Sequence, residues 1–272
     1  MGALVNLAIG LEYDGTRYAG WQQQKNALAV QVVVEKAISA VAAVPTTTVC
    51  AGRTDSGVHA LGQVVSFSCE NERSSKAWIR GCNSNLPADV RLLWVRQTAA
   101  DFSARFSATQ RHYRYLIYNR PVASAISALR MVHQPRKLDV EKMQQAADVL
   151  VGTHDFSSYR ATSCQAVSPV RTVSRLQVVR FDEVVAIDVS ANAFLYHMVR
   201  NIAGVLMAIG LGDKPVDWSA SVLAAQDRRC AGMTAPPHGL YLVGVDYPDW
   251  DAESVSNRHP LLEGFWRHGD KG

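Results

Sequence analysis

Segments typical of strands and helices follow one another in the same order in both halves of this chain. In the first half, strand, helix, strand, strand, helix and strand are predicted at residues 5–13, 30–44, 46–52, 63–69, 74–83 and 90–96. In the second half, the same order is predicted at residues 111–118, 139–151, 171–180, 184–190, 196–210 and 240–247, with an additional short helix at 219–226. This is the order of the split βαβ, or ferredoxin-like, unit. The chain is therefore expected to contain two copies of one supersecondary motif.

The individual assignments follow from periodicity and from residues that begin or end helices. Apolar side chains recur at helical spacing through residues 30–44, and Pro45 ends that helix because proline cannot continue it. Ser74 or Ser75 is suited to cap the next helix, and Asp139 to cap the first helix of the second half. We predict an α+β fold of two ferredoxin-like (split βαβ) subdomains whose antiparallel sheets meet at a central cleft.

The predicted domain boundaries follow this duplication. Residues 1–105 are expected to form the N-terminal subdomain, and residues 106–250 the C-terminal subdomain. Residues 251–272 are polar and irregular in pattern, and we expect them to form a tail. A chain of 272 residues that is 48% hydrophobic is long enough and apolar enough to bury the core that this arrangement needs.

Composition sets aside several classes of protein. No run approaches the roughly 18 apolar residues of a membrane span, and the first residues lack the charged and apolar regions of a signal peptide. We therefore expect a cytoplasmic protein that does not enter a membrane. The five cysteines are widely spaced without a Cys-x-x-Cys pair, and the eight histidines form no H-E-x-x-H pair. We expect reduced, mostly buried cysteines and no metal.

Positive charge is concentrated in one part of the chain. The net charge is only +4, but residues 101–180 hold 12 Lys and Arg against five Asp and Glu. Four tyrosines are interleaved with these basic residues: Tyr113, Tyr115, Tyr118 and Tyr159. Basic side chains among aromatic ones suit a phosphate backbone with unstacked bases, and a solvated basic face is the alternative.

A polar loop lies between the predicted strands at 46–52 and 63–69. It holds Arg53, Asp55 and three glycines, Gly52, Gly57 and Gly62, which allow positive φ or a close approach to a ligand. Arg53 can keep the carboxylate of Asp55 ionised and available as a nucleophile or base. A loop aspartate that only caps a helix or closes a turn is the alternative.

Residues 51–64, AGRTDSGVHALGQV, resemble the signature of the TruA family of tRNA pseudouridine synthases. The resemblance extends over about residues 7–247, with further matching blocks in family order: Tyr13-Asp14-Gly15, Arg111 to Tyr115, Phe194 to Asn201 and Gly239-Leu240-Tyr241-Leu242. A run of this length is far more specific than a short pattern such as G-x-G-x-x-G. It implies that Asp55 is the catalytic nucleophile.

The same resemblance implies roles for residues outside the loop. Tyr113, in the pattern Arg-x-Tyr-x-Tyr, is expected to lie against the target base, although core packing alone would explain a lone tyrosine in a strand. Arg200 lies in a largely apolar helix, where a guanidinium needs a partner, and the family pattern supplies Asp55. Tyr113, Arg53 and Arg200 are therefore the expected substrate-binding residues. His112 and Tyr159 depart from the more usual family residues, and His59 and His197 have no expected catalytic role.

The activity that the resemblance implies is isomerisation of uridine to pseudouridine at positions 38, 39 and 40, in the anticodon stem-loop of tRNA. This reaction requires no cofactor, and the sequence contains no P-loop or dinucleotide fingerprint. The target base must be flipped out of the stem-loop. Relatives act as homodimers with tRNA as their partner, so a homodimer is expected by resemblance.

Two other classes of protein fit parts of the pattern. A ferredoxin-like protein with a basic cleft could bind RNA without catalysis, but the aromatic RNP pattern of an RRM is missing from the sequence and Asp55 would have no role. An aspartate-dependent hydrolase of a phosphorylated small molecule would need Mg²⁺ and further carboxylates near Asp55 in the sequence. The hydrolase would lose activity on addition of EDTA, whereas a pseudouridine synthase would not.

Overall fold

A computed structural model describes residues 4–70, 73–248 and 250. Within it the chain forms two compact units. Unit 1 contains the described residues up to Thr109 together with those from Leu242 onward, and unit 2 contains Gln110–Tyr241. Most of the last strand therefore belongs to unit 1, whereas the sequence-based division placed it in the C-terminal subdomain. The predicted polar tail over 251–272 lies outside the described residues.

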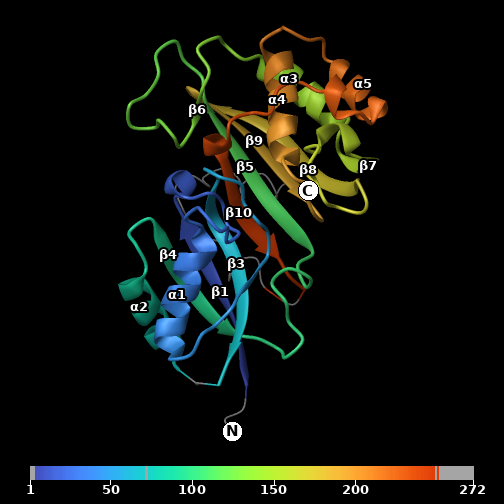
Figure 1. Ribbon diagram of the computed structural model, residues 1–272. Coiled ribbons are helices and arrows are strands. Elements are labelled where there is room, and N and C mark those ends of the chain that lie inside the picture. Colours follow the sequence, from blue (N-terminus) through green and yellow to red (C-terminus); the bar gives the residue numbers. More distant parts are fainter. Residues whose placement is uncertain (1–3, 71–72, 249, 251–272) are drawn as a thin grey trace. The chain divides into compact units, whose positions relative to one another are not determined.

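Unit 1 is built on antiparallel strands with helices packed on them (Figure 1). Its strands lie in the order β4–β1–β3, with β10 next to β3, and the short β2 also pairs with β3. The elements are β1 (Val5–Tyr13), α1 (Val30–Ala42), β2 (Val49–Cys50), β3 (His59–Cys69), α2 (Ser75–Asn85), β4 (Val90–Gln97) and β10 (Leu240–Asp246).

The helices of unit 1 cover their strands through the apolar positions that the sequence predicts. α1 buries Val30, Val34 and Ile38, which lie on one face at helical spacing. Ser74 caps α2, its side chain accepting a hydrogen bond from the backbone N–H of Ala77, as expected for a serine at this position. These contacts give unit 1 a core between its helices and β3.

Unit 2 has the strand order β5–β9–β8–β7, with β6 beside β5. α3 packs on β8 and on α4, and α4 also contacts β5 (Figure 1). Asp139 caps α3 by accepting a hydrogen bond from the Lys142 N–H. The elements are β5 (Gln110–Tyr118), β6 (Val132–His133), α3 (Val140–Asp148), β7 (Gly152–Asp155), β8 (Val170–Phe181), β9 (Val184–Ala191), α4 (Met198–Gly210) and α5 (Trp218–Ala225).

The structure corrects three of the expected elements. The strand expected at 46–52 is only β2, because the threonines before it bind α1 instead: the N–H of Thr48 donates to Glu35 at 2.8 Å. β3 begins at His59 rather than at residue 63, so the second half of the predicted loop is strand. α4 begins at Met198 rather than at residue 196. β6 and β7 were not predicted.

The described part of the chain is thus a mixed α+β protein with five α-helices and mainly antiparallel strands. The predicted succession of strand, helix, strand, strand, helix, strand is present in both halves, with these changes in boundary.

Candidate active site

The loop that carries Asp55 is held by a second loop of unit 1, residues 14–21. The backbone N–H of Trp21 donates to the Thr54 carbonyl at 2.9 Å, and the N–H of Gly57 donates to the Tyr18 carbonyl at 3.3 Å. Inside the Asp55 loop, the Val58 N–H donates to the Asp55 carbonyl at 3.1 Å and closes a turn. Asp55 therefore lies on a turn that backbone hydrogen bonds help to fix.

Glycine permits this close packing of the two loops. Gly20 has φ of +94°, and a Cβ on it would lie 2.5 Å from the Thr54 carbonyl oxygen. Gly57 has φ of +75°, as the sequence predicted for a glycine of this loop. Gly62, in contrast, is in β3, where a Cβ would lie 2.5 Å from the Val243 carbonyl oxygen. The close approach at Gly62 is to a strand and not to a ligand.

Buried polar side chains form hydrogen bonds with residues of the Asp55 loop. The hydroxyl groups of Tyr13 and Thr54 are 2.8 Å apart, and the Gln63 amide donates to the Gly52 carbonyl at 2.6 Å. Burial raises the pKa of the Tyr13 hydroxyl, and the hydrogen bonds from Thr54 and Gln63 only partly oppose this effect. Tyr13 therefore stays neutral, and it supports the loop without placing a second anion near Asp55.

His59 has a structural role at the end of this loop. It is buried, with 2% of its surface exposed, and its Nδ1 accepts a hydrogen bond from the Gly15 N–H at 3.0 Å. This bond joins the two loops at the start of β3. The contact gives His59 a structural role, and its lack of a catalytic one stays a prediction.

The side chains of Arg53 and Asp55 differ in exposure. Arg53 is exposed, whereas Asp55 is half-buried. Burial raises the pKa of the Cys50 thiol to about 12, and the charge of Arg53 opposes this rise. The Arg53 guanidinium thus lies close enough to the start of the loop to act there electrostatically. Its pairing with Asp55 remains a prediction.

Tyr113 lies in β5 of unit 2, opposite Val189 of β9. Its ring is 7% exposed, and it meets the ring of Phe194 edge to face, with centroids 5.0 Å apart and planes at 82°. Phe194 therefore fixes the orientation of the Tyr113 ring. Sequence reasoning missed this contact because the two residues are far apart in the chain.

The next residue of β5 forms a buried ion pair that the sequence did not reveal. Arg114 lies opposite Asp188 in the β5–β9 register, and its guanidinium donates to both carboxylate oxygens, at 2.7 and 2.8 Å. The side chains are 3% and 1% exposed. A charged residue in each of two apolar strands was the available signal, but only the register shows that they pair. This pair fixes the strands beside Tyr113.

Arg200 lies in the first turn of α4 and binds the segment that precedes β10. Its Nε donates to the Ala235 carbonyl at 2.8 Å, and its own carbonyl accepts from the Ala235 N–H at 3.1 Å. Burial raises the pKa of the Tyr115 hydroxyl, and the positive charge of Arg200 partly opposes this. Since Tyr113 and Tyr115 share one face of β5, Arg200 lies on the same side of unit 2 as Tyr113.

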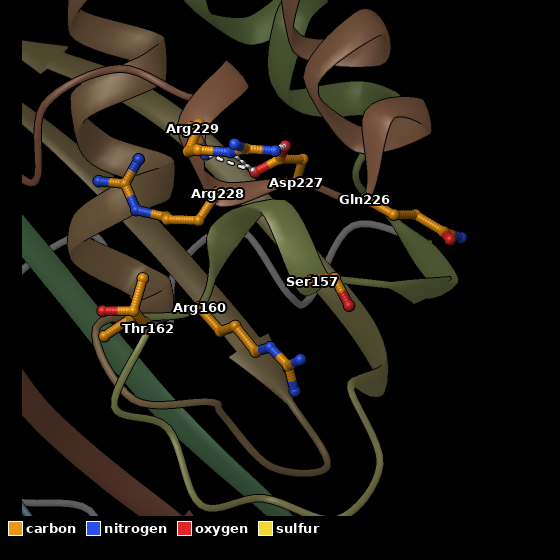
Figure 2. A pocket seen from close by; sticks show the side chains of 8 residues that line it. Ser157, Arg160, Thr162, Gln226, Asp227, Arg228 and Arg229 are labelled. Carbon is orange, nitrogen blue, oxygen red and sulfur yellow. Dashed lines mark hydrogen bonds and ion pairs between the residues drawn. The ribbon is translucent and has the colours of Figure 1, made fainter.

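A hollow of about 410 Å³ is lined by residues in and next to two short 3-10 helices, η2 (Ser157–Tyr159) and η3 (Arg228–Cys230) (Figure 2). Arg228 is directed toward α4, where its guanidinium donates to Asn201 Oδ1 at 3.2 Å and to Thr234 Oγ1 at 3.0 Å (Figure 2). Arg229 instead forms an ion pair with Asp227 at 2.7 Å. Arg228 therefore anchors α4 at the residue next to Arg200, a positioning role that the sequence did not indicate.

The structure places the predicted site residues in two groups. Arg53 and Asp55 lie on one loop of unit 1, and Tyr113 and Arg200 lie on one side of unit 2. The interleaved tyrosines are mostly core residues rather than an exposed stacking surface: Tyr115 and Tyr159 are fully buried. Two of the five cysteines, Cys69 and Cys82, are buried, fewer than expected.

Neither a metal cluster nor a membrane span is found in the described residues. Among residues 4–70, 73–248 and 250, no three His, Cys, Asp or Glu side chains gather as a metal site would require. Within the same residues, each helix is too short or too polar to cross a bilayer.

Comparison with known proteins gives extensive matches. The family model of tRNA pseudouridine synthases matches residues 10–107 and 146–248. A tRNA pseudouridine synthase A of Pseudomonas aeruginosa is 53% identical over 243 residues, which cover 89% of this chain and 85% of the relative. Those of Hydrogenovibrio crunogenus and Pseudoalteromonas atlantica are 54% and 51% identical, over 89% and 95% of this chain and 93% and 98% of their own lengths.

A structural comparison is much weaker. A chain in the crystal structure of a Cbf5-Nop10-Gar1 complex aligns with 94% of this chain at 14% identity, and the alignment covers 54% of that chain. The TM-score is 0.40, a level at which the likeness carries no argument about fold or function.

Proposed function

Because the chain belongs to the tRNA pseudouridine synthase family and is an isomerase acting on tRNA, we propose that it converts uridines 38, 39 and 40 of the anticodon stem-loop, with Asp55 as the catalytic nucleophile. The observation that carries this proposal is the Asp55 turn: backbone bonds from Trp21, Gly57 and Val58 hold the loop in a defined shape and so preorganise Asp55 for reaction.

The reaction exchanges one bond of the nucleoside for another. The bond between uracil N1 and ribose C1′ breaks, the uracil turns, and a bond forms between C5 and C1′. C5 loses its hydrogen and N1 gains one, so the conversion is an isomerisation without oxidant, reductant or cofactor. In this proposal Asp55 acts on the nucleoside, and Arg200 and Arg53 keep its carboxylate ionised and oriented.

Tyr113 stacks on the target uracil in the same proposal. Its ring is held at a fixed angle by Phe194, so little freedom is lost when a base binds against it. Flipping the base out of the stem-loop costs a few kcal/mol, which stacking and phosphate contacts offset. The excess of basic residues over 101–180 suits those phosphate contacts.

We also propose that each unit is a ferredoxin-like subdomain. The strand order β4–β1–β3, with β2 on the other side of β3, supports this for unit 1. In unit 2, the order β5–β9–β8 supports it as well. These are the first, third and second predicted strands of that half, and they lie in the same order as β1, β3 and β2 of unit 1. A cytoplasmic location, where tRNA is modified, is part of the proposal.

Tritium release tests the proposed chemistry. With tRNA labelled at uracil C5, the enzyme should release tritium to water, because C5 exchanges its hydrogen for the bond to C1′. We expect the rate to be unchanged by EDTA, since no step uses a metal. Loss of release on addition of EDTA would favour the metal-dependent hydrolase, and tRNA binding without release would favour a non-catalytic RNA-binding module.

A homodimer is the proposed form of the enzyme, on the basis of its family. Light scattering at micromolar concentration should give twice the chain mass of 29.8 kDa. A monomer that remains fully active in the tritium assay would contradict this part of the proposal.

A further inference from the structure

One aromatic side chain of unit 1 is exposed beside a cation and has no role in the proposed mechanism. Phe106 is 79% exposed, whereas most large apolar residues of unit 1 form its core. The guanidinium carbon of Arg105 lies 5.1 Å from the centroid of its ring. This distance is that of a cation–π contact, in which the guanidinium covers the ring.

The turn that carries this pair is firmly anchored. Its Ala104 is fully buried, its N–H donating to Ser66 Oγ at 3.0 Å and its carbonyl accepting from the Tyr247 hydroxyl at 2.7 Å. The Ser107 N–H donates to the Ser103 carbonyl at 2.9 Å and closes the turn. Arg105 and Phe106 therefore extend from a preorganised support, which limits the entropy lost when they bind a ligand.

The anchor also places the turn beside the strand that leads into the Asp55 loop. Ser66 of β3 pairs with Val49 of β2, and Cys50 of β2 immediately precedes that loop. The charges of Arg105 and Arg53 both oppose the rise in the pKa of the Cys50 thiol that burial causes. The turn of residues 103–107 is thus joined through Ser66 to the strand that leads into the Asp55 loop.

We propose that Arg105 and Phe106 form a second nucleotide-binding site, in which an unpaired base of the tRNA next to the target stacks on Phe106 while Arg105 contacts a flanking phosphate. An aromatic ring covered by a guanidinium on one side and open on the other is suited to a base, because every base has a π-face. The site would take any of the four bases, since no hydrogen-bonding group is presented for readout. This inference rests on the proposed function.

The test is Phe106→Ala, assayed with the unmodified tRNA transcript. Loss of one base stack should weaken tRNA binding between about five- and 150-fold and raise KM accordingly, with little change in kcat at saturating tRNA. Phe106→Trp should restore binding, because the indole also stacks. Val44→Ala, which removes another exposed apolar side chain of unit 1 (46% exposed), in the segment that follows α1, should change neither constant.

The variant Arg105→Gln separates the electrostatic contribution of Arg105 to tRNA binding from the stacking contribution of Phe106. The tRNA affinity of the Arg105→Gln variant should depend less steeply on salt than that of the wild type, with the slope of log K against log salt smaller in magnitude by about one. Phe106→Ala should leave this slope unchanged. Unchanged binding and KM in Phe106→Ala, with active wild type, would overturn the inference and leave the proposed function intact. A changed molecular mass with unchanged tRNA affinity would also overturn it, since Phe106 would then serve a protein interface. If the wild type releases no tritium, the proposed function fails first.

Discussion

Replacing Asp55 with asparagine should reduce pseudouridine formation by roughly 10⁴-fold or more, while tRNA binding changes little. The substitution keeps the shape of the side chain but removes the charge that the proposed chemistry uses. The turn should survive, because asparagine has the same size and the backbone bonds from Trp21, Gly57 and Val58 remain in place. The measurement is nucleoside chromatography of tRNA after single-turnover incubation with excess enzyme.

Ser56→Ala is the matched control in the same turn. Ser56 is exposed, and its hydroxyl donates to the Tyr18 carbonyl at 3.3 Å, a long bond whose loss should have only a small effect. We therefore expect near wild-type pseudouridine formation in this variant. An Asp55→Asn enzyme with more than about a hundredth of the wild-type rate would show that Asp55 has at most an accessory role, since a general base alone contributes roughly 10²-fold or more.

Asp188→Ala should destabilise the protein by about 3–5 kcal/mol, the largest stability effect that we expect from one substitution. It leaves the guanidinium of Arg114 buried without the carboxylate that now accepts hydrogen bonds at 2.7 and 2.8 Å. Because the pair links β5 and β9 next to Tyr113, the variant should also lose activity at temperatures where the wild type is fully folded. Urea unfolding followed by circular dichroism measures the change.

Two further variants show whether the loss comes from an uncompensated charge. The double variant Arg114→Met, Asp188→Leu should be much more stable than Asp188→Ala, because apolar side chains of similar volume replace the whole pair. Asp213→Ala removes the partner of Arg136 in a surface pair at 2.9 Å and should have a far smaller effect, since both side chains are at least half exposed. A double variant no more stable than Asp188→Ala would contradict this account of the pair.

Most of the secondary structure follows from local patterns in the sequence. Ser74 and Asp139 cap α2 and α3 as predicted, because short polar side chains accept backbone hydrogen bonds at these positions. The strands β1, β4, β5, β8 and β9 lie within one residue of the predicted bounds, since continuous apolar or alternating runs define them. These features depend only on neighbours along the chain.

The features that the sequence could not predict depend on contacts between distant residues. β2 is short because Thr48 binds Glu35 of α1. The β-propensity of a segment does not show that one of its residues will bind a helix instead of a strand. The tyrosines of the basic region were expected to include stacking residues, but the fold places Tyr115 and Tyr159 in the core. The Arg114–Asp188 pair depends on strand register in the same way.

The candidate site also combines residues that the local sequence indicates with residues that only the fold brings together. Asp55 stood out because arginine and glycines surround it in a polar loop, and family resemblance then implied its role. The support from residues 14–21, including the tight packing of Gly20 on Thr54, joins loops that are more than 30 residues apart and leaves no local signal. Arg228, which binds Asn201 beside Arg200, was missed for the same reason.

Tritium release at defined positions tests the central claim, that Asp55 isomerises uridines 38 to 40, most directly. Two C5-labelled transcripts of one tRNA would be compared, one with uridines at positions 38, 39 and 40 and one with cytidines there. The account predicts release from the first transcript by the wild type, none from the second, and none from either by Asp55→Ala, although that variant still binds tRNA. Equal release from both transcripts, or release by Asp55→Ala, would contradict it.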